Sequence, residues 1–226
     1  MKFRFKLDGN PFDKNGEIKL GEYHIPSFLN TNSPVCVECG VGIGGFIKKN
    51  ANNFAQIYSF EACYSNFVSA LKLIEENNIE NAAIFNFAVC DVTGNLVKIK
   101  AKSIYGCSTV FYDKEDVDYH NVFSISLEDI FNFIEEPRIH YLKVDIEGAE
   151  YGFLMNKNLE KIDVIAIEIH KNLLKEHKKL TDFIKRTHKL IWNDSSTNQE
   201  CLFLNRNTLN EFKFDDKIEK EKLKKK

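Results

Sequence analysis

Apolar and polar residues follow one another along the chain in blocks that predict strands and helices in alternation. Short apolar runs bounded by turn residues predict strands over 35–39, 56–61, 82–89, 96–101, 140–147 and 163–170. Between these runs, apolar residues recur at helical spacing, most clearly within 65–78 at Phe67, Ala70, Leu71 and Ile74. Strands that alternate with helices predict an α/β fold, with a mostly parallel sheet and helices on both of its faces.

Helix and turn signals complete the expected order of elements. Ser126, three residues before Asp129, is expected to cap a helix that ends before Pro137. The remaining helices are expected over 44–53, 148–156 and 171 to about 188, and a closing antiparallel strand pair over 188–194 and 200–206. Glu150, in the first turn of one of these helices, suits the positive end of the helix dipole.

Neither an internal repeat nor an interior linker divides the sequence, so we expect a single domain over residues 1–226. Residues 1–32 are polar and rich in turn signals, which predicts an N-terminal extension before a core over 35–205. The segment 102–123 is expected to be irregular, and the lysine-rich residues 211–226 form a charged tail that we expect to be solvated.

The composition is that of an ordinary soluble globular protein. Of the 226 residues, 43% are hydrophobic and 28% are charged, which is enough for one domain with a sizeable core. The net charge of −2 provides no basic field, so we expect neither nucleic acid nor an anionic membrane as a partner. No apolar run is long enough to span a membrane, and the N-terminus lacks the apolar stretch of a signal peptide. We therefore expect a cytoplasmic protein.

The cysteines do not indicate a metal or redox centre. Cys36 and Cys39 form a C-x-x-C motif, but it lies inside a predicted strand, where residues three apart point to opposite faces. The six cysteines are spread through apolar contexts, which predicts reduced and mostly buried thiols.

The stretch VCVECGVGIGG is a strand that ends in glycines. Gly40, Gly42 and Gly45 have the G-x-G-x-x-G spacing of a dinucleotide loop, which holds a pyrophosphate at a helix N-terminus. Glu38, just before the first glycine, would repel a pyrophosphate but attract the ammonium and sulfonium groups of S-adenosylmethionine. Glu61, at the end of the second strand, suits the ribose of either ligand. An NAD-dependent oxidoreductase therefore stays open beside a methyl-donor site.

Two predicted strands, YLKVDIEGAE and VIAIEIH, carry charges where a doubly wound sheet should be apolar. The expected charged faces carry Lys143, Asp145 and Glu147 on the first strand and Glu168 and His170 on the second. Unpaired buried charges cost several kcal/mol each, so we expect the two sets to meet near the carboxyl ends of the strands, where such sheets bind ligands. A purely structural ion-pair network, with Lys143 between Asp145 and Glu168, is the alternative.

Together these blocks resemble the FkbM family of S-adenosylmethionine-dependent O-methyltransferases over roughly residues 35–173. The resemblance rests, in order along the chain, on VECGVGIGG, SFEACYSNF, FNFAVCDVTGN, SLEDI, YLKVDIEGAEYGFL and IAIEIH. The first motif of the family usually reads Asp-x-Gly-Ala-Asn-x-Gly, and here Glu38, Val41 and Gly42 take the places of Asp, Ala and Asn. Ala62 takes the place of the proline after the second acid.

The resemblance implies a class I, Rossmann-like methyltransferase that uses S-adenosylmethionine to methylate a hydroxyl, often on a sugar or a glycosylated natural product. A nucleotide-activated sugar is one such acceptor. The donor-binding residues implied are Glu38, Gly40, Gly42 and Gly44 at the methionine end, Glu61 at the ribose, and Ala62, Asn86 and Ala88 at the adenine.

Methyl transfer to an alcohol requires a group that removes the proton of the alcohol. The candidates are Asp145 and His170, with Lys143 orienting Asp145 or offsetting its charge, and His170 is expected to titrate near neutrality. No spacing is specific for a metal, so we predict no metal site, although these carboxylates and His170 could also bind a divalent ion. The segment 102–123 is expected to form the acceptor pocket. A homo-oligomer, and a non-catalytic scaffold that docks through the lysine tail, also stay open.

Overall fold

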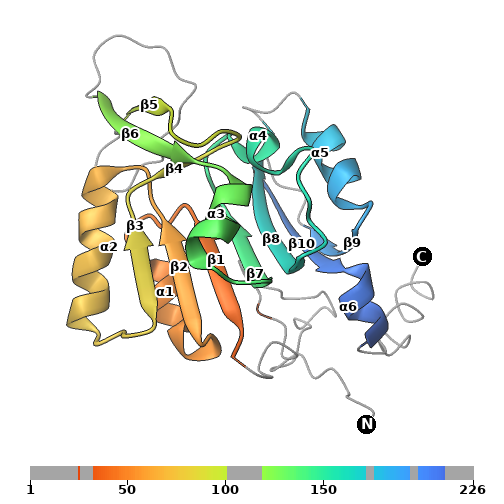
Figure 1. Cartoon of the computed structure of the whole chain (residues 1–226), viewed down its shortest axis with the longest axis horizontal. Helices are drawn as coiled ribbons and strands as arrows, with labels where there is room; N and C mark the ends of the chain where they lie inside the picture. Colours follow the sequence, from red (N-terminus) through yellow and green to blue (C-terminus); the bar gives the residue numbers. More distant parts are fainter. Residues whose placement is uncertain (1–24, 26–32, 101–118, 172–175, 194–197, 212–226) are drawn as a thin grey trace, which may run out of the picture.

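The computed structural model describes residue 25 and residues 33–100, 119–171, 176–193 and 198–211 (Figure 1). The expected N-terminal extension, the charged tail and most of the expected acceptor segment lie outside the described residues. None of the helices in the described ranges combines the length and the apolar character needed to cross a bilayer.

A central sheet organises the described residues, with the strand order β3-β2-β1-β7-β8-β10-β9. Its strands are β1 (Val35–Cys39), β2 (Gln56–Phe60), β3 (Ala82–Phe85), β7 (Ile139–Val144), β8 (Ile162–His170), β9 (His188–Asn193) and β10 (Asn198–Asn205). Neighbouring strands are parallel from β3 to β8, whereas β10 runs antiparallel to both β8 and β9. The mostly parallel sheet and the closing antiparallel pair are therefore confirmed.

Helices cover both faces of this sheet (Figure 1). They are α1 (Gly45–Asn50), the 3-10 helix η2 (Ala51–Asn53), α2 (Tyr64–Glu76), α3 (Leu127–Ile134), α4 (Glu150–Leu154), α5 (His177–Ile184) and α6 (Arg206–Glu211). Ile130 of α3, Phe153 of α4 and Leu180 of α5 belong to one apolar core, and Ile47 of α1 and Ala70 of α2 belong to another. The side chain of Ser126 caps α3, as predicted, by accepting a hydrogen bond from the backbone N–H of Asp129.

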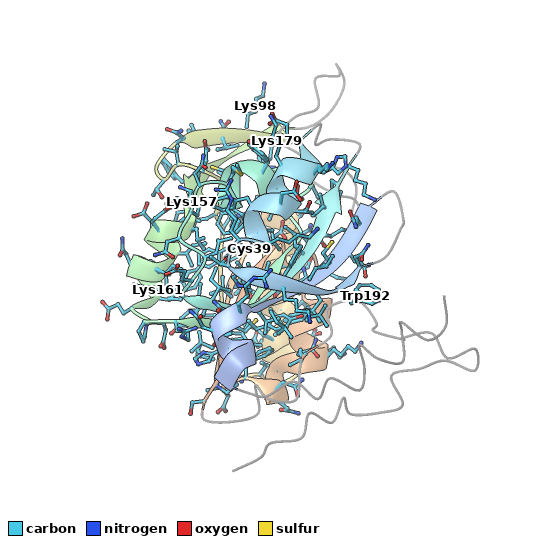
Figure 2. The ribbon with its side chains drawn as sticks, turned by 90° about the vertical axis from the view of Figure 1, so that its right-hand side faces the viewer. Cys39, Lys98, Lys157, Lys161, Lys179 and Trp192 are labelled. Atoms are coloured by element: carbon cyan, nitrogen blue, oxygen red, sulfur yellow. The ribbon has the colours of Figure 1, made fainter. Side chains whose placement is uncertain are left out.

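The two cores lie on opposite faces of β1, as the alternation of side chains along a strand requires. Cys39 belongs to one core and Cys36 to the other, and neither has any exposed surface. Figure 2 shows Cys39 in the middle of the view, among the side chains of the sheet, and Lys98 at the edge of the molecule. The prediction that the two cysteines of the C-x-x-C motif face opposite ways is confirmed, and both thiols are free in the structure.

The expected third strand over 82–89 is two strands in two sheets. β3 ends at Phe85, and the amide of Asn86 then donates hydrogen bonds to the carbonyls of Glu61 and Ala62. The chain continues as β4 (Ala88–Val89), which with β5 (Leu96–Lys100) and β6 (Tyr119–Ile125) forms a small second sheet of order β4-β6-β5. The prediction of an irregular segment through residue 123 was therefore wrong at its C-terminal end, where β6 pairs with β5.

The chain turns earlier than predicted after β7, which ends at Val144 instead of residue 147. The backbone N–H of Asp145 still donates to the carbonyl of Cys39, at 2.9 Å. Glu147 and Gly148 then have φ values of 52° and 106°, which end the strand. Asp145 and Glu147 therefore lie in a turn at the carboxyl end of the sheet, and the prediction that they alternate along one strand face was wrong.

Candidate active site

The glycine loop connects β1 to α1 and depends on left-handed backbone. Gly40, Gly42 and Gly44 have φ values of 84°, 57° and 91°, a region that other residues enter only at a cost. Gly40 is also in close contact with the end of β7, because a Cβ there would overlap the backbone carbonyl of Asp145. The sequence thus allows the loop to lie directly against the segment that carries Asp145.

Glu61, just after β2, holds this loop from the neighbouring strand end. Its Oε2 accepts hydrogen bonds from the backbone N–H groups of Val41, at 3.0 Å, and Gly42, at 2.8 Å, and its Oε1 accepts from Cys63 at 2.8 Å. Burial raises the pKa of the Glu61 carboxyl, and these backbone hydrogen bonds oppose the shift. The acid expected at the ribose therefore also fixes the shape of the loop that would hold the methionine end.

The residues expected at the adenine end lie beyond Glu61. Asn86 uses its amide to hold the carbonyls of Glu61 and Ala62, at 2.8 and 3.1 Å. On the other side, Nε2 of His120 lies 3.0 Å from the carbonyl oxygen of Ala62. Ala88 is buried in a third, smaller apolar cluster with Cys63, Ile99 and Val122, so its methyl group faces protein. Asn86 and His120 thus position the Ala62 backbone, and the adenine contacts stay a prediction.

Glu38, expected near the ammonium group of the donor, is buried beneath the loop. Its Oε1 lies 3.6 Å from Nζ of Lys143, and its Oε2 accepts a hydrogen bond from Ser59 at 3.0 Å. Burial raises the pKa of Glu38 to about 7, although the charge of Lys143 opposes the shift. Lys143 also donates to the carbonyl of Gly40 at 2.6 Å, so the Glu38–Lys143 pair supports the loop from inside.

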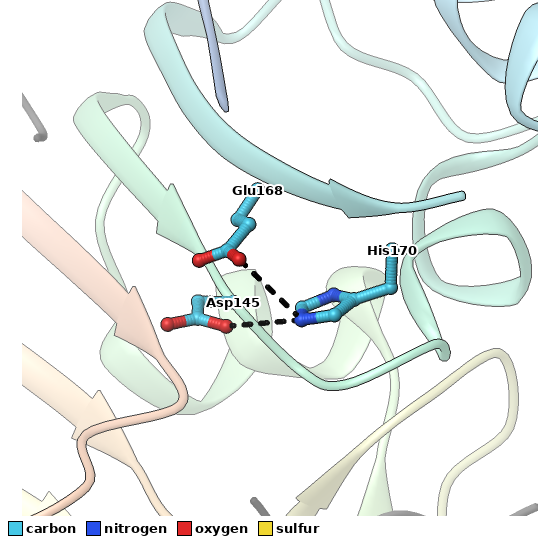
Figure 3. A group of neighbouring side chains, drawn as sticks. All are labelled: Asp145, Glu168 and His170. Carbon is cyan, nitrogen blue, oxygen red and sulfur yellow. Dashed lines mark ion pairs between the residues drawn. The ribbon is translucent and has the colours of Figure 1, made fainter. Parts of the chain in front are cut away.

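The charged side chains at the ends of β7 and β8 meet around one imidazole, that of His170. Its Nε2 lies 3.1 Å from Glu147 Oε2, 3.7 Å from Glu168 Oε1 and 4.0 Å from Asp145 Oδ1, and its Nδ1 lies 2.8 Å from Glu150 Oε1. We refer to these five residues as the His170 cluster. Figure 3 shows Asp145 and Glu168 on the same side of the ring. The structure therefore brings the two predicted charged sets together.

His170 is not a neutral base in this arrangement. Burial lowers the pKa of its imidazole, but hydrogen bonds to Glu147 and Glu150 and their negative charges outweigh burial and raise the pKa to about 10. The expectation that His170 titrates near neutrality was therefore wrong, because it did not take into account how many carboxylates surround the ring. As an imidazolium, His170 holds the carboxylates together.

Lys143 and Asp145 interact as predicted, with Nζ of Lys143 3.8 Å from Oδ2 of Asp145. Lys143 also pairs with Glu38, so it joins the base of the glycine loop to the His170 cluster. About a quarter of the Asp145 side chain is exposed (27%), compared with 5% for His170. Of the two candidate bases, Asp145 and His170, Asp145 is therefore the more exposed.

Sequence reasoning missed two residues of this region. Glu150 was interpreted as a helix N-terminal acid, and His120 fell in the segment predicted to be irregular. Glu150 is completely buried, and it accepts hydrogen bonds from the backbone N–H of Gly148 and from His170. The signal that could have found Glu150 is its place in the charged block, three residues after Glu147. His120 gave no comparable signal.

The strand order, the glycine loop after β1 and the acid after β2 define a class I, Rossmann-like methyltransferase fold. The chain belongs to the family described as the methyltransferase FkbM domain, whose model matches residues 24–195. S-adenosylmethionine is accordingly the methyl donor. This membership supports a methyltransferase over the NAD-dependent oxidoreductase and the non-catalytic scaffold that the sequence left open.

The chain is also similar to individual proteins. It is 28% identical over 162 residues, 66% of this chain and 75% of the other, to a tRNA (guanine-N(7)-)-methyltransferase of Oceanobacillus iheyensis. Among solved structures, an rRNA methylase from Streptococcus thermophilus has a TM-score of 0.49 and 12% identity, over 79% of this chain and 90% of that chain. TrmK of M. capricolum in complex with S-adenosylhomocysteine has a TM-score of 0.45 and 14% identity, over 81% and 69%.

Proposed function

We propose that the protein transfers a methyl group from S-adenosylmethionine to a hydroxyl oxygen of a small-molecule acceptor, a sugar or nucleotide-activated sugar. The observation that carries this proposal is the His170 cluster, which lies against the glycine loop through the contact of Gly40 with Asp145. In the reaction, the bond between sulfur and the methyl carbon breaks as a bond from that carbon to the acceptor oxygen forms. The hydroxyl proton must then pass to a base.

The surroundings of Asp145 suit it to take that proton. A hydroxyl must lose a proton when its oxygen is methylated, whereas a ring nitrogen with a free lone pair can be methylated first, without a base. A positioned base typically contributes about 10²–10⁴-fold to the rate. Asp145 is the most exposed carboxylate of the cluster, and its Oδ2 forms an ion pair with Nζ of Lys143. His170, protonated at neutral pH, is proposed to keep the carboxylates in position.

The charge of the cluster also favours a neutral polyol over a polyanion. Carboxylates accept hydrogen bonds from sugar hydroxyls, whereas they repel the phosphates of a nucleic acid. The net charge of −2 provides no opposing basic field over the chain as a whole. These two observations support the sugar-type acceptor and the expected absence of a nucleic-acid partner.

One finding favours a second candidate, methylation of a base in RNA. The relative that is 28% identical over 162 residues is named for transfer to N7 of guanine in tRNA. Its acceptor atom is a ring nitrogen, which requires no proton acceptor of the kind that the His170 cluster offers. The two candidates therefore predict different effects of removing Asp145.

The test is a screen with labelled S-adenosylmethionine against free sugars, nucleotide-activated sugars and unmodified total tRNA. We expect label on a sugar-containing acceptor, in an ether bond that mild base does not cleave. Asp145→Asn should abolish most of this transfer, and Glu76→Gln, at an exposed helical carboxylate, should not change it. Transfer to tRNA alone, unaffected by Asp145→Asn, would overturn the proposal in favour of the second candidate.

A further inference from the structure

The His170 cluster contains more negative charge than proton transfer from one hydroxyl requires. Four carboxylates lie within 4.0 Å of a single imidazole, and Lys143 is shared between Asp145 and Glu38. Like charges at such separations are costly away from bulk water unless a cation lies among them. The cluster therefore gathers the kinds of donor atom, carboxylate oxygens and a ring nitrogen, that a divalent cation can bind.

The donor atoms lie close to the separations that a divalent ion requires. One oxygen of Asp145, one oxygen of Glu168 and a ring nitrogen of His170 all lie within 4.8 Å of one another. Nε2 of His170 is 4.0 Å from the Asp145 oxygen and 3.7 Å from the Glu168 oxygen (Figure 3). An octahedral ion with bonds of about 2.1 Å places its donors roughly 3 to 4.2 Å apart, so small side-chain rotations suffice.

The second ring nitrogen of His170 is held as metal-binding histidines usually are. Nδ1 lies 2.8 Å from Oε1 of Glu150, which is completely buried and is itself fixed by the N–H of Gly148 at 3.0 Å. A carboxylate on one ring nitrogen orients the other toward a metal and raises its basicity. This contact directs Nε2 toward Asp145 and Glu168.

Glu150 provides an independent sign that positive charge belongs here. Its other oxygen, Oε2, is buried and accepts no hydrogen bond from any described residue. A buried carboxylate oxygen without a donor is costly, commonly by about 1–3 kcal/mol or more. A cation bound at Nε2 of His170 would attract this carboxylate from across the ring and offset part of the cost.

We propose that Asp145, Glu168 and His170 bind one divalent cation of the Mg²⁺ or Mn²⁺ class at the carboxyl ends of β7 and β8. The two carboxylates suit such ions, and the imidazole adds one nitrogen donor. The ion takes the place of the proton on Nε2, which is released to solvent, and it displaces Glu147, now 3.1 Å from Nε2, from the ring. Asp145, Glu147 and Glu168 are partly exposed, so an ion can enter and keep open positions for a further ligand.

The role of the ion in catalysis rests on the proposed hydroxyl methylation. A hydroxyl bound to a divalent cation is more acidic, and it is held at a fixed place beside the glycine loop. An acceptor with two neighbouring hydroxyls, such as a sugar diol, would fill two adjacent positions on the ion. The cation thereby narrows the acceptor class to molecules that can chelate.

The test is Mn²⁺ binding to the full chain without donor or acceptor, followed by electron paramagnetic resonance. We expect one Mn²⁺ per chain, and pulsed measurements should detect coupling to an imidazole nitrogen. Asp145→Asn and Glu168→Gln should each weaken binding at least tenfold, His170→Gln should remove the nitrogen coupling, and the control Glu76→Gln should change neither. Circular dichroism of each variant verifies the fold.

The proposal is overturned if the folded variants bind Mn²⁺ as the wild type does, or if the bound ion shows no nitrogen coupling. Because the measurement uses no methyl donor and no acceptor, it is independent of the acceptor screen. A screen that finds transfer to tRNA alone would overturn the hydroxyl proposal but would not affect the Mn²⁺ result. A failure to bind Mn²⁺ would overturn the metal site but would not affect the hydroxyl proposal.

Discussion

The backbone carbonyl of Asp145 occupies the space in which a side chain on Gly40 would begin. The contact joins the donor loop after β1 to the turn after β7, two segments that are more than one hundred residues apart in sequence. Any residue other than glycine at position 40 must push these two segments apart. The structural requirement at Gly40 is therefore stricter than at the other glycines of the loop.

We predict that Gly40→Ala lowers the free energy of unfolding by at least about 2 kcal/mol, because it combines a positive φ with a backbone overlap. The matched control is Gly42→Ala, which also has a positive φ but has nothing within 4 Å of the added Cβ. That change should cost about 1–2 kcal/mol through backbone conformation alone. Urea denaturation measures both, and an equal cost at the two positions would contradict the proposed contact.

Glu61→Gln is predicted to weaken binding of S-adenosylhomocysteine about 10- to 100-fold. The amide group that replaces one carboxylate oxygen cannot accept, so at least one of the N–H groups of Val41, Gly42 and Cys63 loses its partner, at about 1–3 kcal/mol. Calorimetric titration measures the affinity, with Glu75→Gln on the exposed face of α2 as the control. Unchanged affinity in Glu61→Gln would show that the loop keeps its shape without the acid.

Asp145→Asn is predicted to lower kcat by about 10²–10⁴-fold while the affinity for S-adenosylhomocysteine changes less than threefold. The asparagine keeps the size of the side chain but removes the proton acceptor. His170→Ala should also lower turnover, because the carboxylates of the cluster lose the imidazolium that holds them. Single-turnover kinetics separates chemistry from binding, and near wild-type turnover in both variants would exclude the proposed acid–base site.

His188 should make stability depend on pH at a place far from the cluster. It is completely buried, and burial, reinforced by the charge of Arg206, lowers its pKa to about 4 despite a hydrogen bond to the carbonyl of Ile162. Between about pH 6.5 and pH 4 the unfolded chain binds a proton that the folded chain does not. Stability should therefore fall as the pH falls through this range, by up to about 3 kcal/mol.

His188→Gln should flatten this part of the pH profile, and His177→Gln, at a partly exposed position on α5, should leave it unchanged. Denaturation at several pH values measures the slope directly. A wild-type slope in His188→Gln would assign the effect to other groups. The two substitutions are comparable because each replaces an imidazole with an amide.

Much of the fold could be predicted because it depends on local patterns. The buried strands are almost entirely apolar, and the helices show one apolar face, so their order along the chain predicted the parallel sheet. β6 was missed in part because its first residues, Tyr119, His120 and Asn121, are polar and its partner β5 is separated from it by the long segment 101–118. Pairing over such a distance leaves no periodic signal in the sequence.

The sequence predicted which residues meet in the candidate site, but it did not predict the pKa that His170 has there. The charged positions in two successive strands predicted that Lys143, Asp145, Glu168 and His170 would meet. The pKa of His170 could not be predicted, because it depends on how closely Glu147 and Glu150 approach the ring, and that approach depends on the turn after Val144. Positive φ at Glu147, a non-glycine residue, has no sequence signature of its own.

The two thiols on opposite faces of β1 allow opening of the central sheet to be followed by thiol modification. Burial raises the pKa of both Cys36 and Cys39, and neither has exposed surface, so a thiol reagent finds no thiolate while β1 stays paired with β2 and β7. Among the cysteines that the structure describes, Cys90 is only partly buried, so it should react before the other four. The slower modification of Cys36 and Cys39 would then measure the rate at which the central strand opens, and a bound donor should lower that rate.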